Sequence, residues 1–268
     1  MPDLDPAVLG LAEDANTYTP VRPDDERIED DRYVIYLARG GGHPAFTVVQ
    51  RLRLADVEAD LAEIRTLLRE RGRLPCTWEV GTHATPVGVV DRLLDLGLEP
   101  YSEPLAIGMV LRTEPAGGPP TILARRVQTP EELAEATRIA RIAFGHEDPD
   151  AVDLDQAVRD LQDEQREGTW ASYVALAGDF PVAQAQATFT PHGVVMNGGS
   201  TLPQARGRGA YRALVWARWN DAVARGTPVL ITQAGAMSRP VLERLGFEAV
   251  CEIAILLDDP DGEIASKP

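Results

Sequence analysis

The chain has few of the residues on which metal sites and disulfides depend. Its two cysteines, Cys76 and Cys251, lie far apart and match neither the spacing of a zinc site nor that of a redox motif. Two isolated thiols in a chain of this size are typical of buried, reduced cysteines in the cytosol. We therefore expect a cytoplasmic protein that binds no metal.

Long apolar runs and positive charge are scarce as well. No apolar run approaches the roughly 20 residues that a membrane span needs, and the opening "MPDLDPAVLGLAEDAN" lacks the basic start and apolar stretch of a secretory signal. Lysine and arginine number 26 against 42 aspartates and glutamates, which gives a net charge of −16, and Lys267 is the single lysine. This balance disfavours nucleic acid as a partner, and no membrane contact is expected. It is compatible with a partner that carries an amine.

The 268 residues, 44% of them hydrophobic, are enough for one large or two modest domains. Residues 1–30 are rich in acidic side chains and are expected to form a solvated lead-in. The segment "TEPAGGPP" at 113–120 has the proline and glycine content of a linker. The sequence therefore predicts domains at 31–112 and 121–258, followed by a short tail at 259–268.

Hydrophobic periodicity gives the order of elements in each domain. In the first, strands are expected at 33–38, 46–54, 76–81 and 106–112, with helices at 55–72 and 85–97. In the second, strands are expected at 121–127, 171–178, 181–190, 194–202, 228–233 and 249–257, with helices at about 129–144, 153–167, 208–225 and 237–246. The order β-α-α-β-β-β-α-β-α-β of the second domain implies a mixed sheet, because three successive strands precede the first crossover.

A similar four-residue segment occurs in both predicted domains. Leu96-Gly97-Leu98-Glu99 follows a helix and precedes a strand, and Leu245-Gly246-Phe247-Glu248 does the same near the end of the chain. Because the two quartets hold the same place in the element order, we expect a duplicated fold.

The stretch "TLPQARGRGAYRAL" at 201–214 combines three arginines and two glycines at the start of a helix. A helix N-terminus leaves its first amides unpaired and carries partial positive charge, and Gly207 and Gly209 would let those amides approach an anion closely. The stretch lacks the Gly-Lys-Ser/Thr ending of a P-loop and the three-glycine Rossmann spacing. A simple tight turn and a nucleic-acid contact remain the alternatives, the latter disfavoured by the acidic composition. The pattern is typical of a pyrophosphate site.

At these residues the chain resembles the GCN5-related N-acetyltransferase family, GNAT. Gln204, Gly207 and Gly209 fill the family's Gln/Arg-x-x-Gly-x-Gly/Ala motif, and the Leu-Gly-Phe at 245–247 resembles its C-terminal helix-to-strand junction. The resemblance covers about 121–258. It implies an α/β (α+β) tandem GNAT-like fold in two related domains, each with a mixed, mostly antiparallel sheet flanked by helices. The first domain would be a truncated copy without a coenzyme site, because its corresponding junction, "QRLRLADVEADL", has no glycine.

The resemblance also implies a reaction: transfer of an acetyl group from acetyl-CoA to a primary amine by direct attack on the thioester. The amine would belong to a small molecule or a peptide. The end of the preceding strand would pair with the pantetheine arm, and the amides of 206–211 would hold the pyrophosphate. The residues expected to bind acetyl-CoA are Ser200, Thr201, Leu202, Gln204, Arg206, Gly207, Arg208, Gly209, Ala210 and Tyr211.

The chain departs from the family pattern at three places. Leu242 stands where many members have a tyrosine that protonates the leaving thiolate, and the strand at 194–201 has none of the carboxylates that often act as base. Tyr211 occupies the position of a frequent third glycine. No catalytic residue is assigned, because the sequence does not rank the possible bases Glu147, Asp148, His192 and Glu252. A non-catalytic acyl-CoA-binding or regulatory module is therefore the alternative function, and the sequence gives no indication of the oligomeric state.

Overall fold

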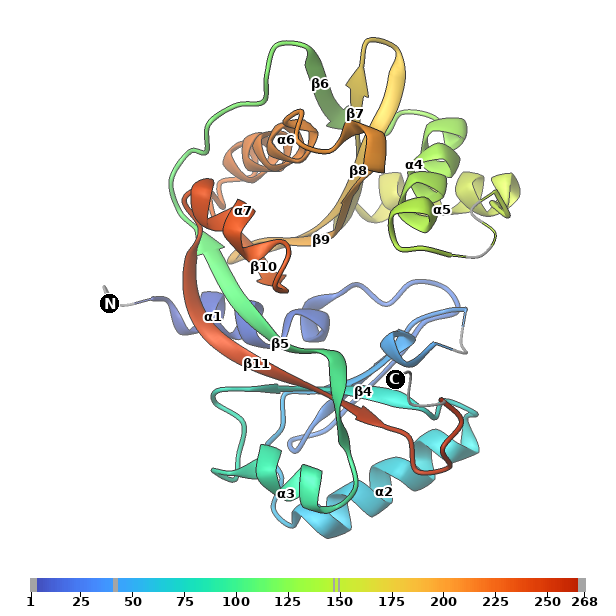
Figure 1. Cartoon of the computed structure of the whole chain (residues 1–268), viewed down its shortest axis with the longest axis vertical. Helices are drawn as coiled ribbons and strands as arrows, with labels where there is room; N and C mark the ends of the chain where they lie inside the picture. Colours follow the sequence, from blue (N-terminus) through green and yellow to red (C-terminus); the bar gives the residue numbers. More distant parts are fainter. Residues whose placement is uncertain (1–3, 41–42, 147, 149, 265–268) are drawn as a thin grey trace. The chain divides into compact units, whose positions relative to one another are not determined.

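The chain folds into two units, and each unit is built from more than one stretch of the sequence. The computed structural model describes residues 4–40, 43–146, 148 and 150–264 (Figure 1). Unit 1 comprises the described residues of Met1–Met109, Gln233–Pro240 and Ala249–Pro268, and unit 2 comprises those of Val110–Thr232 and Val241–Glu248. The end of the chain therefore contributes segments to both units.

The second part of the chain has the predicted order of elements, β-α-α-β-β-β-α-β-α-β. Strands β6, β7, β8 and β9 pair antiparallel in sequence order, and β9 pairs parallel with β10, so the expected mixed sheet is confirmed. The elements are β6 Ile122–Arg126, α4 Pro130–Ala143, α5 Leu154–Glu167, β7 Trp170–Ala177, β8 Phe180–Thr190, β9 Gly193–Thr201, the 3-10 helix η3 Pro203–Ala205, α6 Ala210–Ala224, β10 Leu230–Ala234, α7 Arg239–Arg244 and β11 Glu248–Asp258.

Local sequence signals fix the helix starts in unit 2. The Thr129 side chain accepts a hydrogen bond from the N–H of Glu132 at 3.3 Å, and Pro130 takes the first helical position of α4. In α5 the Asp153 carboxylate accepts the N–H of Gln156 at 3.1 Å. Both caps satisfy amides that a helix N-terminus would otherwise leave unpaired.

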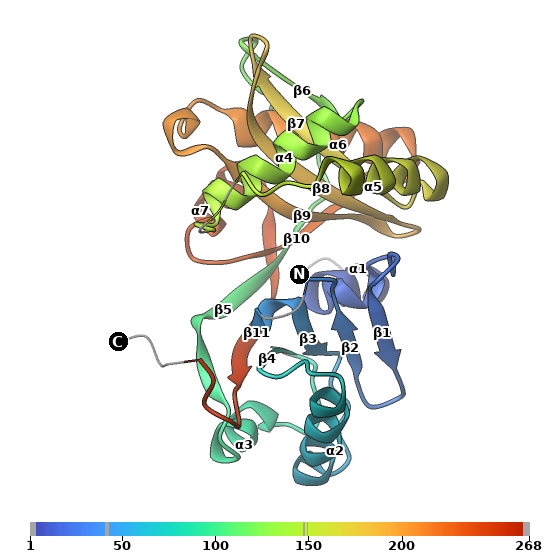
Figure 2. The same cartoon turned by 90° about the vertical axis from the view of Figure 1, so that its right-hand side faces the viewer.

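Helices cover both faces of the unit 2 sheet. Helices α4 and α5 lie on one face and α6 on the other (Figures 1 and 2). Strand β8 alternates alanine with glutamine: Gln184 and Gln186 face α4, so Ala183, Ala185 and Ala187 point to the α6 side. Small side chains there leave room for α6 to approach the sheet, while polar side chains lie under α4.

Unit 1 begins with the acidic segment at 1–30. Leu11 and Ala12 are completely buried, so this segment contributes a packed helix rather than only a solvated lead-in. The elements are α1 Pro6–Glu13, the 3-10 helix η1 Ala15–Tyr18, β1 Glu26–Glu29, β2 Val34–Leu37, the 3-10 helix η2 Pro44–Phe46, β3 Thr47–Gln50, α2 Val57–Glu70, β4 Cys76–Gly81, α3 Val89–Asp95 and β5 Glu99–Leu111.

The strand pairing of unit 1 repeats that of unit 2. Strands β1, β2 and β3 pair antiparallel, α2 follows, and β4 then pairs parallel with β3. The run β7-β8-β9-α6-β10 has the same order and the same directions. The predicted duplication of the fold is thus confirmed.

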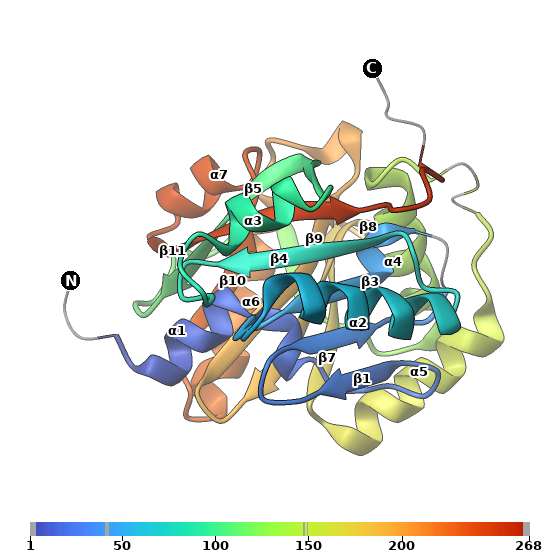
Figure 3. The same cartoon turned by 90° about the horizontal axis from the view of Figure 1, so that it is seen from below.

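The last strand of the chain lies in the unit 1 sheet. Strand β11 pairs antiparallel with β4 over Ile253–Asp258. Helices α2 and α3 lie across this sheet (Figure 3), and the fully buried Trp78 of β4 lies in the core beneath them. The linker at 113–120 therefore separates the two repeats of the sequence. It does not separate the two structural units, because β11 belongs to the second repeat but packs in unit 1.

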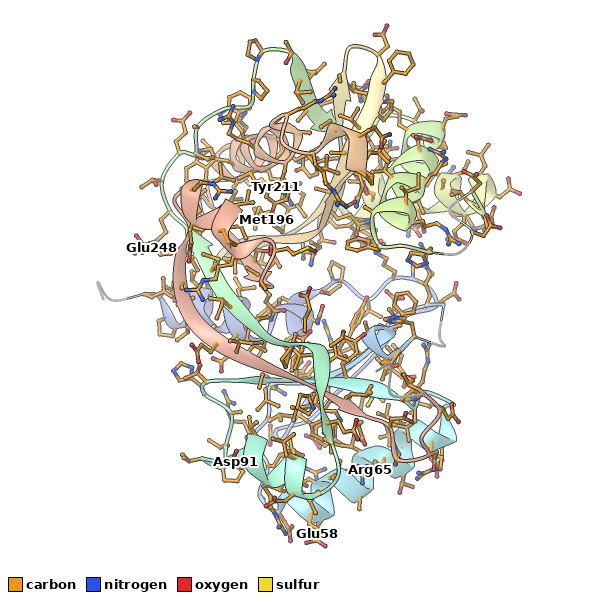
Figure 4. All side chains as sticks on the ribbon, in the orientation of Figure 1. Glu58, Arg65, Asp91, Met196, Tyr211 and Glu248 are labelled. Carbon is orange, nitrogen blue, oxygen red and sulfur yellow. The ribbon has the colours of Figure 1, made fainter. Side chains whose placement is uncertain are left out.

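A buried ion pair connects β11 with α2. Arg65 of α2, labelled in Figure 4, donates hydrogen bonds of 2.7, 3.0 and 3.2 Å to the carboxylate of Asp258, which is completely buried. We expect Asp258→Asn to lower the free energy of unfolding by about 2 kcal/mol, because it removes the charge that compensates a partly buried guanidinium. Urea unfolding at pH 7 measures this loss.

Asp261→Asn is the matched control for that substitution. Asp261 pairs with Arg69 of the same helix at 3.4 Å, but both side chains are 54% exposed. Such a pair contributes less than about 0.5 kcal/mol. Equal losses in the two variants would contradict a special role for the Asp258 pair.

The described residues contain no helix with both the length and the hydropathy that a bilayer span requires. Within the same residues, no group of three or more His, Cys, Asp or Glu side chains is placed to hold a metal ion. Cys76 and Cys251 are both free and buried.

Candidate functional site

The connection between β9 and α6, here called the β9–α6 turn (Leu202–Gly209), holds its two glycines in conformations that favour glycine. Gly207 has φ +75° and Gly209 has φ +85°, both in the left-handed region. A Cβ on Gly209 would also lie 2.8 Å from Cδ of Pro119, closer than packed atoms come. Conformation and space together therefore require glycine at 209.

Helix α6 starts with an open N-terminus. Gly209 is its N-cap and has no side chain to accept an amide hydrogen. Among the described residues, no carbonyl or side chain accepts from the N–H groups of 207–212, and the first bonded amide is that of Ala213, which donates to Gly209 at 3.0 Å. Several amides thus point out of the helix end without an acceptor, which is the arrangement that binds anions.

Three arginines surround this helix end without a carboxylate partner. Arg206 and Arg208 are exposed, and within the part of the chain that the structure describes neither they nor Arg212 forms an ion pair. Arg206 makes a long bond of 3.4 Å from Nε to the carbonyl of Thr201, and Nε of Arg212 is buried without a hydrogen-bond acceptor. The positive charge here is uncompensated, in a protein whose net charge is −16.

The equivalent helix of unit 1 is closed by its own side chains. The Asp56 carboxylate accepts the N–H of Ala59 at 3.2 Å, and Asp60 accepts those of Ala55 and Asp56 at 3.0 and 3.2 Å. Two carboxylates therefore occupy the space that an anion would need at the start of α2. Of the two repeats, the second has the open helix end.

Strand β9 has a free edge next to this helix end. It pairs with β10 only at Val194 and Val195, although it continues to Thr201. The N–H of Leu202 donates to Val182 on the β8 side at 2.9 Å. Because successive residues of a strand direct their main-chain groups to opposite sides, those of Thr201 face the free edge. An extended, amide-containing ligand could pair there as an added strand.

A β-bulge interrupts β9 along the same free edge. Gln184 lies opposite Ser200 and Gln186 opposite Asn197, so β9 has one residue more than β8 between these pairs. The extra residue lies at Gly198, which has φ +53°. A bulge breaks the regular ladder and redirects main-chain groups. The bulge therefore interrupts the regular pairing of β8 with β9 at Gly198 and Gly199.

Tyr211 packs over the bulge from the α6 side. A Cβ on Gly199 would lie 2.8 Å from Cε2 of Tyr211, so the ring lies directly against the glycine. Figure 4 labels Tyr211. Behind the ring lies Arg218, which is completely enclosed and has its guanidinium carbon 6.0 Å from the ring centroid. Burial lowers the pKa of Arg218, while the nearby hydroxyls of Tyr211 and Tyr173 act in the opposite direction. A phenol and a buried cation thus adjoin the bulge.

The ten residues predicted to bind acetyl-CoA are close neighbours in the sequence and run from the end of β9 through the β9–α6 turn to the first turn of α6. Ser200 bonds to the Gln184 side chain at 2.8 Å, and Leu202 is buried. Gln204 lies exposed in η3, and Ala210 is buried at the start of α6. The residues that face solvent around the open helix end are Arg206, Gly207 and Arg208.

Two of the four possible bases, Asp148 and His192, lie in other connections of unit 2. Asp148 lies in the connection between α4 and α5, where its carbonyl accepts two bonds from Arg141. His192 is in the turn before β9, six residues or roughly 20 Å of extended strand from Gly198. Glu252 belongs to β11 in unit 1, and Glu147 lies outside the described residues.

Leu242, which stands at the position of the family's tyrosine, is 1% exposed and offers no hydroxyl. Trp78 and Trp219 are buried in the cores of their units. Trp216 is partly exposed and lies near Gly117 of the segment before β6, with Nε1 at 3.8 Å from a Cβ placed on that glycine.

Sequence reasoning missed Gln184, Gln186 and Arg218. The sequence did contain a signal for the two glutamines. They alternate with alanines in a strand that is expected to have helices on both faces, where polar side chains are unusual. Arg218 gave no such signal, because an arginine in an amphipathic helix is usually exposed. Its burial depends on the small alanines of β8, which lie on a different element.

Comparison with known proteins identifies solved structures with a similar fold. No protein-family model and no curated protein matches the chain. Among solved structures, a GCN5-related N-acetyltransferase from Kribbella flavida is 18% identical, with TM-score 0.70, over 96% of this chain and 97% of that one. A tandem GNAT protein from the clavulanic acid biosynthesis pathway is 15% identical, with TM-score 0.61, over 94% and 87% of the respective chains.

A third similar structure is a GCN5-related N-acetyltransferase from Sphaerobacter thermophilus, 18% identical with TM-score 0.59, over 85% of this chain and 80% of that one. At these identities the likeness establishes the fold. The chain has the fold of tandem GNAT proteins, as the motif at Gln204, Gly207 and Gly209 led us to expect.

Proposed function

We propose that this protein is an acetyl-CoA-dependent N-acetyltransferase with a single coenzyme site, in the second repeat. The observation that carries the proposal is the open N-terminus of α6, where unpaired amides and three arginines without carboxylate partners meet the free edge of β9. An open helix end of this kind fits a diphosphate, and a free strand edge fits the amide-containing arm of coenzyme A.

The residues of the β9–α6 turn fit the pyrophosphate. Gly207 and Gly209 leave the amides accessible, and Arg206 and Arg208 add charge at the rim. The pantetheine arm would pair with the main chain of Thr201 along the free edge. Acetyl-CoA, when bound, supplies an activated acyl group, and the chain supplies its orientation.

The bulge at Gly198 and Gly199 is the place we assign to the reacting carbonyl. A main-chain amide at this interruption of the β8 pairing would stabilise negative charge on the carbonyl oxygen as it develops. The neutral amine attacks the carbonyl carbon, the new C–N bond forms as the C–S bond breaks, and the amine's proton passes to water. The Tyr211 hydroxyl, on the ring that covers Gly199, is the nearest candidate to protonate the leaving thiolate, since Leu242 offers none.

The acceptor we propose is an amine of a small molecule or peptide, and we place the reaction in the cytosol, where two free, buried thiols stay reduced. The absence of a hydroxyl at 242 and of a carboxylate on β9 supports the alternative, a module that binds acyl-CoA without turnover.

Two measurements on the full chain separate these functions. Calorimetry with acetyl-CoA tests the site, and we expect a 1:1 complex. Release of free thiol, followed with a disulfide reagent against a panel of amines and peptides, tests the transfer. Binding together with amine-dependent thiol release supports the transferase, and binding without release for any acceptor supports the non-catalytic module. No binding at all would contradict both.

A further inference from the structure

Unit 2 contains a cavity of about 190 Å³ on the face of its sheet opposite α6, between α4 and strands β7 to β9. Its outer wall is formed by Leu133, Ala136, Thr137 and Ala140 of α4 and by Phe144 just after the helix, and it is apolar apart from the Thr137 hydroxyl, which donates to the carbonyl of Leu133 at 3.0 Å. Phe144 is 62% exposed at the end of the helix. The cavity therefore combines an apolar wall with an exposed aromatic ring at its edge.

The floor of the cavity is polar but uncharged. It is formed by Ser172, Gln184 and Gln186, whose side chains point from two neighbouring strands toward α4. The amide nitrogen of Gln184 donates to Gly198 O and to Ser200 Oγ. Within the described residues, the side chains of Gln186 and Ser172 make no hydrogen bond, so they remain available to a ligand. None of the described residues that line the cavity carries a charge.

The cavity reaches the same bulge as the proposed coenzyme site, from the other side. Gly198 lines the cavity, whereas the next residue, Gly199, faces α6 and lies under Tyr211. A molecule in the cavity would therefore approach the free edge of β9 from the face opposite the β9–α6 turn. This is the approach that a second substrate needs when the first enters along α6.

We infer that this cavity binds the acceptor, and that the acceptor is a small, weakly basic primary amine with an apolar body about the size of one aromatic ring; the inference rests on the proposed function. The volume is sufficient for one ring, since a cavity of about 150 Å³ holds benzene, and the exposed lining residues Thr137 and Phe144 leave this cavity partly open to solvent. The weak basicity follows from the lining: an ammonium group buried without a carboxylate is strongly disfavoured, whereas an uncharged amine needs only hydrogen-bonding partners such as Gln186 and Ser172.

Aniline and benzylamine form a matched pair of probes. Both carry one ring and one primary amine, but at neutral pH aniline is uncharged and benzylamine is an ammonium. With saturating acetyl-CoA we expect the kcat/KM for aniline to exceed that for benzylamine by at least 10-fold. Equal use of the two amines, or preference for benzylamine, would overturn the inference.

A cavity-filling variant links this preference to the cavity. Ala140 is partly exposed and lines the wall, so Ala140→Phe would fill the space while remaining tolerable to the fold. We expect the KM for aniline to rise at least 10-fold with no change in the Kd for acetyl-CoA. Ala143→Phe, on the same helix but outside the lining, should change neither quantity. An unchanged KM in Ala140→Phe would locate the acceptor elsewhere.

Direct binding distinguishes failure of this inference from failure of the proposed function. Aniline is titrated by NMR into the protein saturated with acetyl-CoA. If the coenzyme binds and aniline does not, the inference is wrong and the proposed coenzyme site stands. If acetyl-CoA itself does not bind, the proposed function fails and the inference fails with it. Aniline binding that Ala140→Phe abolishes and Ala143→Phe preserves supports the cavity as the acceptor site.

Discussion

Replacing Gly207 with glutamate is expected to weaken acetyl-CoA binding by about 100-fold or more while both units remain folded. A Cβ at Gly207 meets no atom within 4 Å, so the added side chain has room, and its carboxylate lies among the unpaired amides of the helix end. There it both repels a diphosphate and competes for the same N–H groups. A 100-fold loss corresponds to about 2.7 kcal/mol of binding free energy. Isothermal titration calorimetry at low and moderate salt measures it.

Gly207→Gln is the matched control. Glutamine has nearly the shape of glutamate and meets the same backbone cost at φ +75°, but it carries no charge. We expect it to lower affinity by less than about 5-fold, since only the electrostatic part of the effect is removed. Equal losses of acetyl-CoA affinity in the two variants would show that glycine is needed at this position for its backbone conformation and not for the approach of an anion.

A second control places the same charge in the other repeat. Ala55 is exposed at the start of α2, where Asp56 and Asp60 already occupy the amides. Ala55→Glu should leave acetyl-CoA affinity unchanged. A large loss from this variant would mean that the first repeat binds the coenzyme.

Glu79→Gln is expected to stabilise the protein by about 3 kcal/mol at pH 8 and to have no effect at pH 4. Glu79 of β4 has its pKa raised from 4.5 to about 7, chiefly by burial and then by the charge of Asp14. The side chains of Gln233 and Asn16 donate hydrogen bonds to this carboxylate, Asn16 through Nδ2 at 3.5 Å from Oε2, and both oppose the increase in its pKa. A shift of this size is equivalent to about 3 kcal/mol between the neutral and ionised forms.

The direction follows from linkage. The folded pKa is higher than the unfolded one, so folding favours the protonated carboxyl, and its contribution is complete below about pH 4.5. That contribution is lost as pH rises through about 7. Glutamine does not titrate, so the difference in free energy of unfolding between variant and wild type should grow from pH 4.5 and level off above pH 7. Urea unfolding across this range measures the difference.

Asp14 contributes a second part of the same pH dependence. Burial and the charge of Glu13 raise its pKa from 3.8 to about 6, although it accepts the N–H of Arg51 at 2.9 Å. The Glu79→Gln substitution removes only the part of the pH dependence that Glu79 causes. The free energy of unfolding of the variant should therefore still change with pH below about pH 6. A destabilised Glu79→Gln at pH 8 would mean that the ionised carboxylate is needed by the fold.

The structure also shows why the acidic N-terminal segment could not be understood from composition. Its aspartates and glutamates suggest solvation, yet Glu13 and Asp14 are 4% and 7% exposed, and their carboxylates contact His83 and Arg51 respectively. None of these partners is near in the sequence. Burial of a charged residue depends on what covers it, and the local pattern does not contain that information.

By itself, the sequence determined the element order of the second repeat, the duplication and the glycine-rich helix start, because helical periodicity and backbone conformation are properties of neighbouring residues. It did not indicate α1 or β1, which lie in the acidic segment at 1–30. The tertiary structure alone decided that α6 has an open end while α2 is closed by Asp60, that β9 bulges at Gly198, and that a neutral cavity lies beneath α4. It also placed β11 in unit 1, where Asp258 meets Arg65 across 193 residues of chain. Such contacts are set by packing between distant segments, and no local signal encodes them.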